Sequence, residues 1–189
     1  ILDEIVTGFR LSFRGAAHEY KLDPDLFTLG KVVGGGLPIG VLCGDKDIMS
    51  LCNPIGRDKS EVVCYVGGGT FSANPLTMSA GLATLRYLKQ NKSVIYPRID
   101  KIGHTISKGL EKVFSDSKID VDITGIGSLF MTHFLNDNVR KISSALDVGL
   151  SNKDFHRKYH FALIAKHNIF FLPEKMGAIS FSHSLKDAE

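Results

Sequence analysis

Short apolar runs separated by glycine and proline dominate the first third of the chain. Such runs predict buried strands, and the turn residues between them predict tight connections. We expect strands at residues 1–6, 26–29 and 40–44, followed by a short helix at 46–51. Strands that alternate with turns and helices are typical of an α/β fold.

The pattern changes to a helical period after Asn74 and Pro75. Asparagine is a favoured N-cap and proline a favoured first helical residue, so a helix is predicted from there to about Lys89. Apolar residues spaced three and four apart predict a second, amphipathic helix at 94–114. Beyond it the pattern predicts strands and one more helix, at 121–126, 129–135, 151–167 (the helix), 169–172 and 178–181.

These elements divide the chain into three parts. We expect an α/β region over residues 1–93, a linking helix over 94–114 and a smaller α+β domain over 115–189. The chain begins without methionine inside a predicted strand and ends in residues that start a helix without a stop signal. We therefore expect it to be a fragment.

Composition and charge narrow the classes of function. The 189 residues are 43% apolar and 23% charged, which is typical of a soluble globular protein. The net charge of +3 is spread along the chain without a basic tract, so nucleic acid is not an expected partner. Neither a membrane helix nor a signal peptide is predicted, and we expect a cytoplasmic protein.

No metal site is predicted. Cys43, Cys52 and Cys64 have neither a CxxC nor a zinc spacing, so we expect them to be small buried apolar residues. His156 and His160 would lie one helical turn apart, but HRKYH lacks the glutamate of HExxH. The two basic residues between the histidines indicate a solvated helix face.

The stretch PDLFTLGKVVGGGLPIG, residues 24–40, places Lys31 between an apolar run and three glycines. A lysine fixed between a buried strand and a glycine turn can be desolvated, which lowers its pKa and makes its amine nucleophilic. The alternative is an ordinary exposed lysine before a turn.

Two further features could supply groups that act with this lysine. Asp3 and Glu4 are consecutive in a predicted strand, so one carboxylate should point inward and need a partner; alternatively, both lie in water at a frayed strand end. Residues 67–72 bring backbone N–H groups and two hydroxyls ahead of a helix N-terminus, a typical setting for phosphate. The alternative for this segment is a plain glycine linker.

A nucleotide-binding loop of the Walker type is excluded, because Asp25 and Val32 stand where that motif needs glycine and a hydroxyl. What remains is an amine at Lys31, a possible buried acid at Asp3 and a phosphate site at Thr70. Pyridoxal phosphate needs these three groups: an amine to bind its aldehyde, a carboxylate for its ring nitrogen and donors for its phosphate.

The blocks ILDEIVTGFR, PDLFTLGKVVGGGLPIG and GTFSANPLTMSAGLATL resemble the signature blocks of the class III aminotransferases, of pyridoxal phosphate fold type I. The 28-residue step from Asp3 to Lys31 matches that family, and TGFR is similar to its aminomutase branch. The resemblance extends through NKDFHRKYHFALIAKHNIFFLPE and SFSHSLKDAE. It implies the C-terminal part of a large cofactor domain, with a mixed sheet and flanking helices, followed by a small α+β domain.

The resemblance also implies roles for individual residues. Lys31 would form the internal aldimine with pyridoxal 5′-phosphate and then move protons, and Asp3 would pair with the pyridinium nitrogen. Ile5, two residues along the strand from Asp3, would pack on the ring face. Thr70 would bind the cofactor phosphate from the neighbouring subunit of a homodimer with shared active sites. Glu174 is a candidate for the acid that gates the substrate.

The implied reaction moves an amino group between adjacent carbons of glutamate 1-semialdehyde, through a diamino intermediate, and gives the tetrapyrrole precursor 5-aminolevulinate. One alternative is ordinary transamination between another amino donor and a carbonyl acceptor, and a second is an inactive or assembly domain that keeps the fold.

The sequence also departs from the family pattern. An insertion lies around Arg57 to Glu61, and the segment that contains Glu174 is about two residues shorter than in the family. The family's other phosphate loop, its ring-stacking aromatic residue and its substrate-binding arginine would precede Ile1, so we expect the fragment alone to be inactive.

Overall fold

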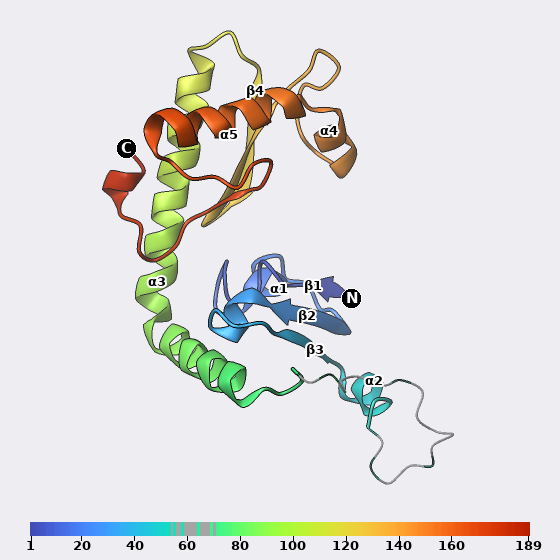
Figure 1. Ribbon diagram of the computed structural model, residues 1–189. Helices are drawn as coiled ribbons and strands as arrows, with labels where there is room; N and C mark the ends of the chain where they lie inside the picture. The colour runs from blue at the N-terminus through green and yellow to red at the C-terminus, as the bar shows by residue number, and fades with distance from the viewer. Residues whose placement is uncertain (54, 56–57, 59–63, 65–68, 70) are drawn as a thin grey trace. The chain divides into compact units, whose positions relative to one another are not determined.

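The computed structural model describes residues 1–189 except 54, 56–57, 59–63, 65–68 and 70. The described chain forms two compact units, Ile1–Ser93 and Val94–Glu189. Each unit contains its own three-stranded sheet (Figure 1). Most of the insertion predicted around Arg57 to Glu61 lies outside the described residues, so its role stays a prediction.

The sheet of the first unit is mixed. It consists of β1 (Leu2–Asp3), β2 (Leu26–Gly30) and β3 (Gly40–Gly44), in the order β1-β2-β3. β1 runs parallel to β2, and β3 runs antiparallel to it. The predictions for β2 and β3 are confirmed, but the first strand is shorter than predicted, because the chain turns away from the sheet after Asp3.

Short helices connect these strands. They are α1 (Gly15–Glu19), the 3-10 helix η1 (Lys31–Gly34) and α2 (Lys46–Ser50). The predicted helix at 46–51 is confirmed by α2, whose N-cap residue Asp45 accepts hydrogen bonds from the N–H groups of Asp47 and Ile48.

The prediction of two separate helices after Pro75 is wrong. A single helix, α3 (Pro75–Ser115), continues for 41 residues and includes Pro97 (Figure 1). Its predicted start is confirmed, because Asn74 Oδ1 accepts hydrogen bonds from the N–H groups of Leu76 and Thr77. The boundary between the two compact units falls within this helix, between Ser93 and Val94.

The second unit has an antiparallel sheet of β4 (Val121–Ile126), β5 (Leu129–Phe134) and β6 (Gly177–Ala178). Its helices are the C-terminal part of α3, then α4 (Ala145–Leu150), α5 (Lys153–His167) and the 3-10 helix η3 (Leu185–Asp187). The predicted strand at 169–172 is not formed, and the one at 178–181 is reduced to β6. Burial of Ile95, Ile99 and Ile102 confirms the apolar face predicted for 94–114.

The core of this unit is aromatic and contains three histidines, His133, His156 and His160. Phe134 is 2% exposed and contacts the ring of Phe155, with centroids 4.6 Å apart. His156 and His160 are 6% and 2% exposed, so the prediction of a solvated face is wrong. The basic residues between them do lie on the solvent side of α5, but the i,i+4 spacing turns both histidines inward.

The cysteines are less buried than predicted. Cys43 and Cys52 are half-buried and Cys64 is exposed, so the interpretation of all three as core residues is wrong. Among the described residues, no helix combines the length and apolar character needed to cross a bilayer.

Candidate active site

Asp3 and Lys31 lie at the same edge of the first unit's sheet. Asp3 ends β1, and Lys31 directly follows β2. The two strands are parallel, with Asp3 opposite Thr28 in register. Both residues therefore stand at the carboxyl ends of neighbouring parallel strands, where open α/β sheets bind their ligands.

The carboxylate of Asp3 is exposed but held on one side. Its Oδ1 accepts hydrogen bonds from the N–H of Ile5 at 2.9 Å and from the hydroxyl of Thr28 at 3.3 Å. Within the described part of the chain, Oδ2 has no hydrogen-bond donor. One oxygen is thus fixed by the protein, and the other can accept a hydrogen bond from a ligand.

The buried acid at this position is Glu4, and not Asp3 as expected. Glu4 is 3% exposed, and its carboxylate accepts hydrogen bonds from the N–H groups of Ala16 at 3.0 Å and Ala17 at 2.7 Å, and from the hydroxyl of Thr7. A Cβ at Gly15 would lie 2.6 Å from this carboxylate, so glycine is required there. The consecutive acids do face opposite ways, as the strand pattern predicts, but the inward one is structural.

Lys31 opens η1 with a φ of 47°, a left-handed value that costs a non-glycine residue about 1 kcal/mol or more. Its side chain is exposed. Of the two readings of the sequence, the structure matches the exposed lysine before a turn, because no described residue covers this position at the sheet edge. The amine is accessible, on a backbone with little freedom.

The turn behind Lys31 packs against α3 with almost no space. A Cβ at Gly35, where φ is 61°, would lie 2.5 Å from the carbonyl oxygen of Ala80. A Cβ at Gly81 would lie 2.4 Å from the carbonyl oxygen of Val33. This close packing against α3 holds the turn that carries Lys31.

Ile5 approaches the same edge from β1. A Cβ at Gly30 would lie 3.2 Å from Ile5 Cγ2, so the isoleucine side chain lies against the residue that precedes Lys31. Ile5 is part of the turn after β1, and not of the strand as expected. Its contact with a cofactor ring stays a prediction.

A hollow of about 600 Å³ begins where β3 starts, beside the end of β2. Its lining includes the first residues of β3 and parts of the segment that leads into α3, among them Gly40, Gly69, Ser72 and Thr77. Thr70 lies outside the described residues, so its predicted contact with a phosphate is untested. The hollow nevertheless shows open space beside that segment.

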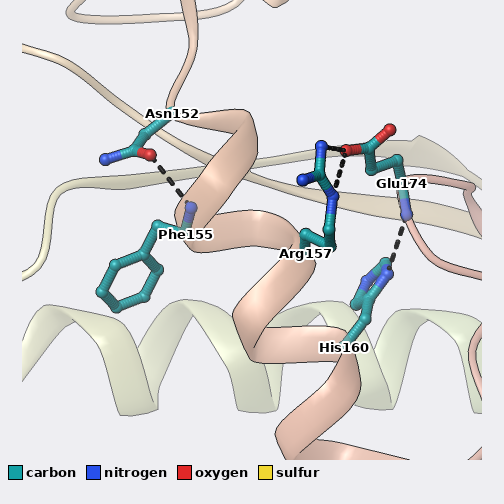
Figure 2. A network of polar contacts seen from close by, with 5 residues as sticks. All are labelled: Asn152, Phe155, Arg157, His160 and Glu174. Carbon is teal, nitrogen blue, oxygen red and sulfur yellow. Dashed lines mark hydrogen bonds and ion pairs between the residues drawn. The ribbon is translucent and has the colours of Figure 1, made fainter.

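In the second unit, Glu174 is fixed by two residues of α5 (Figure 2). Arg157 donates to Glu174 Oε1 from Nε at 3.0 Å and from an Nη at 2.7 Å, and the N–H of Glu174 donates to His160 Nδ1 at 3.2 Å. The Arg157 hydrogen bonds and charge lower the pKa of the Glu174 carboxyl. Glu174 has a φ of 61°, so an acid predicted to gate the substrate sits in a left-handed turn.

The family described as "Aminotransferase class-III" matches residues 1–169 of the 189. The chain belongs to the class-III aminotransferases. Enzymes of this family depend on pyridoxal phosphate, and the resemblance seen in the three sequence blocks is confirmed.

Relatives within the family carry a consistent name. The chain is similar to glutamate-1-semialdehyde 2,1-aminomutases from Sulfolobus acidocaldarius, at 37% identity, and Sulfurisphaera tokodaii, at 38% identity. In both comparisons 99% of this chain matches 42% of the relative. The chain thus spans about two fifths of the length of the relatives it matches.

Solved structures support the fold. An omega-transaminase from Sphaerobacter thermophilus is 29% identical, with a TM-score of 0.80 over 98% of this chain and 40% of its own. A glutamate-1-semialdehyde aminomutase from Pseudomonas aeruginosa has a TM-score of 0.78 at 19% identity, over 98% of this chain and 41% of its own. The predicted class, part of a fold type I pyridoxal phosphate-dependent transferase, is confirmed.

Proposed function

We propose that this class-III aminotransferase chain is part of a pyridoxal phosphate enzyme that converts glutamate 1-semialdehyde into 5-aminolevulinate. The observation that carries the proposal is the placement of Asp3 and Lys31 at the carboxyl ends of neighbouring parallel strands. The identity of 37% and 38% to proteins named as this aminomutase supports the choice of reaction.

The residues present fit the cofactor. An exposed primary amine, a carboxylate with one unpartnered oxygen and a neighbouring hollow lie along one sheet edge of the described structure. When bound, pyridoxal phosphate supplies an aldehyde that condenses with amines and a ring that accepts electrons from the substrate carbon. Asp3 would hold its ring nitrogen and Ile5 would support the ring face.

In this proposal Lys31 has two tasks. Its Nζ would hold the cofactor in the resting enzyme, and after displacement by substrate it would carry a proton to and from the substrate carbon. The turn Lys31–Gly34 is fixed against α3 through Gly35 and Gly81, so Nζ would return to the same place in each cycle.

Further parts of the proposal concern residues outside this edge. Thr70 would bind the cofactor phosphate of a neighbouring subunit, which requires a homodimer, and Glu174 would gate the substrate. The expectation of a cytoplasmic protein, drawn from composition, also stays a prediction.

Reduction tests the cofactor assignment. Protein expressed from the full reading frame should bind pyridoxal phosphate, and borohydride should fix the cofactor on Lys31, as peptide mass analysis can locate. Lys31→Ala should lose the label and about 10³-fold or more of the activity. Lys21→Ala is the matched control, because Lys21 is also exposed and also has a left-handed backbone conformation, with a φ of 53°. A label on another lysine, or none, would refute the assignment and favour an assembly domain.

An ordinary transaminase is the second candidate, because the solved relatives at 29% and 26% identity are an omega-transaminase and a beta-phenylalanine aminotransferase. The two reactions differ in whether the assay needs a second substrate that donates or accepts an amino group. An aminomutase forms 5-aminolevulinate from glutamate 1-semialdehyde without a second amino donor or acceptor. A strict requirement for a second substrate would identify a transaminase.

A further inference from the structure

Thr28 connects β1, which carries Asp3, to β2, which leads into Lys31. It lies on β2 directly opposite Asp3, three residues before Lys31. Its carbonyl oxygen accepts a hydrogen bond from the N–H of Glu4 at 2.9 Å, and its hydroxyl donates to Asp3 Oδ1 at 3.3 Å. The backbone and the side chain of Thr28 therefore both hold the end of β1.

The two donors to Asp3 converge on one oxygen. Because Ile5 N–H and the Thr28 hydroxyl both bond Oδ1, they restrict the rotation of the carboxylate about its last torsion, which is broad in an unrestrained aspartate. Each donor alone would leave the carboxylate free to pivot about one contact. Together they distinguish the occupied Oδ1 from Oδ2, which has no donor within the described residues.

We propose that Thr28 is a positioning residue for Asp3, whose hydroxyl turns Oδ2 toward the ring nitrogen of a bound pyridine cofactor. This inference rests on the proposed function. Thr28 does not itself contact the cofactor in this arrangement; it fixes the orientation of the group that does. A threonine suits the task, since its β-branched side chain is favoured in a strand and its hydroxyl supplies the donor.

Thr28→Val removes the hydroxyl and keeps the shape of the side chain. In protein from the full reading frame, we expect pyridoxal phosphate to bind about three- to tenfold more weakly, the range for one net hydrogen bond. The ¹⁵N resonance of ring-labelled cofactor should also shift toward that of the unprotonated ring, which a purely structural role would not cause. Thr28→Ser should restore both properties.

Thr124→Val is the matched control. Thr124 is also a half-buried strand threonine, and its hydroxyl forms a 2.8 Å hydrogen bond with His133 Nε2 in the second unit. This variant should bind the cofactor as the parent protein does. If Thr28→Val proves unstable, Thr28→Ala, which is smaller and has no side-chain donor, undergoes the same measurements.

The failure of this inference can be told apart from the failure of the proposed function. If the parent protein is labelled by borohydride at Lys31 but Thr28→Val leaves both the affinity and the ¹⁵N resonance unchanged, Thr28 does not position Asp3. If the parent protein neither binds the cofactor nor is labelled at Lys31, the proposed function is wrong, and this inference is wrong with it.

Discussion

The Nε2 atoms of His156 and His160 lie 3.1 Å apart in the interior of the second unit. Because the N–H of Glu174 donates to His160 Nδ1, that nitrogen carries no proton, and the proton of a neutral His160 ring is on Nε2. His160 then donates to His156. The pair fits only when both rings are neutral. A proton on His160 Nδ1 would face the Glu174 N–H, and a proton on His156 Nε2 would face the Nε2–H of His160.

This pair predicts a loss of stability in acid. Burial, then the charge of a protonated His160, then that of His133 on β5 lower the pKa of His156 from 6.5 to about 4, while Glu174 opposes the shift. The pKa of His160 is also lowered, chiefly by burial, with Glu174 again opposing. Between pH 6.5 and about 4 the unfolded chain binds more protons, so stability is full above this window and falls as pH decreases through it.

Urea unfolding at pH 7.5, 5.5 and 4.5 measures the effect, which for His156 is of order 3 kcal/mol. His156→Gln should flatten the dependence on pH in this range, because glutamine does not titrate. His104→Gln is the control, since His104 is exposed on α3. An equally steep dependence in His156→Gln would show that other groups cause it.

The histidine pair also shows where sequence reasoning stops. The spacing of His156 and His160 indicated a shared helix face, which is correct, but Arg157 and Lys158 made that face look solvated. Residues 157 and 158 in fact point away from the pair, to solvent. The aromatic surroundings that bury the histidines come from elsewhere in the chain, including Phe134 and Phe171, so no local pattern could indicate them.

The continuous helix α3 was missed for a similar reason. The sequence pattern predicted one helix to about Lys89 and a second over 94–114, with Pro97 near the start of the second. Proline removes the hydrogen bond to the carbonyl four residues earlier, which is that of Ser93, yet the helix continues. The boundary between the two compact units falls directly after Ser93, so the proline accompanies a change of unit without ending the helix.

Much of the candidate site, in contrast, was visible in the sequence. The strand before Lys31, the glycine turn after it and the N-cap of α3 each have a local signal, and the structure contains all three. The sequence could not show which of Asp3 and Glu4 is buried and which is exposed at the site. Strand alternation says that two consecutive acids face opposite ways, but only the position of α1 determines which one is buried.

Because Glu4 is buried and Asp3 is exposed, substitutions of these two neighbours should affect different properties of the protein. Glu4→Ala should lower the free energy of unfolding by about 2–4 kcal/mol, because it leaves the buried N–H of Ala16 and its neighbour without an acceptor. Asp3→Asn, at an exposed side chain, should change it by less than about 0.5 kcal/mol but should weaken cofactor binding. Urea denaturation and cofactor titration on both variants check the pair. Equal loss of stability in the two would contradict the assignment.

A pair of glycines in α3 tests the packing behind Lys31. Gly81→Ala should destabilise the protein by about 1–3 kcal/mol, because its Cβ would lie 2.4 Å from the carbonyl oxygen of Val33. Gly109→Ala should stabilise it by about 0.5–1 kcal/mol, since Gly109 is exposed in the same helix with nothing within 4 Å of the new Cβ. Thermal unfolding of both variants measures the difference, and destabilisation by Gly109→Ala would contradict it.

Substitutions at the ion pair of Arg157 and Glu174 test whether Glu174 gates the substrate independently of any effect on stability. Both side chains are about half exposed, at 52% and 40%, so the ion pair should contribute no more than about 1 kcal/mol to stability. If Glu174 gates the substrate, Arg157→Gln frees its carboxylate and should change kcat or KM several-fold while the unfolding free energy stays nearly constant. Glu174→Gln should change the same kinetic constant in the same direction.

Asp154→Asn breaks the exposed ion pair of Asp154 with Lys158 on the same helix and is the matched control. Kinetics that stay unchanged in both Arg157→Gln and Glu174→Gln would show that Glu174 has no part in gating, and its left-handed turn would then serve only to connect α5 to β6.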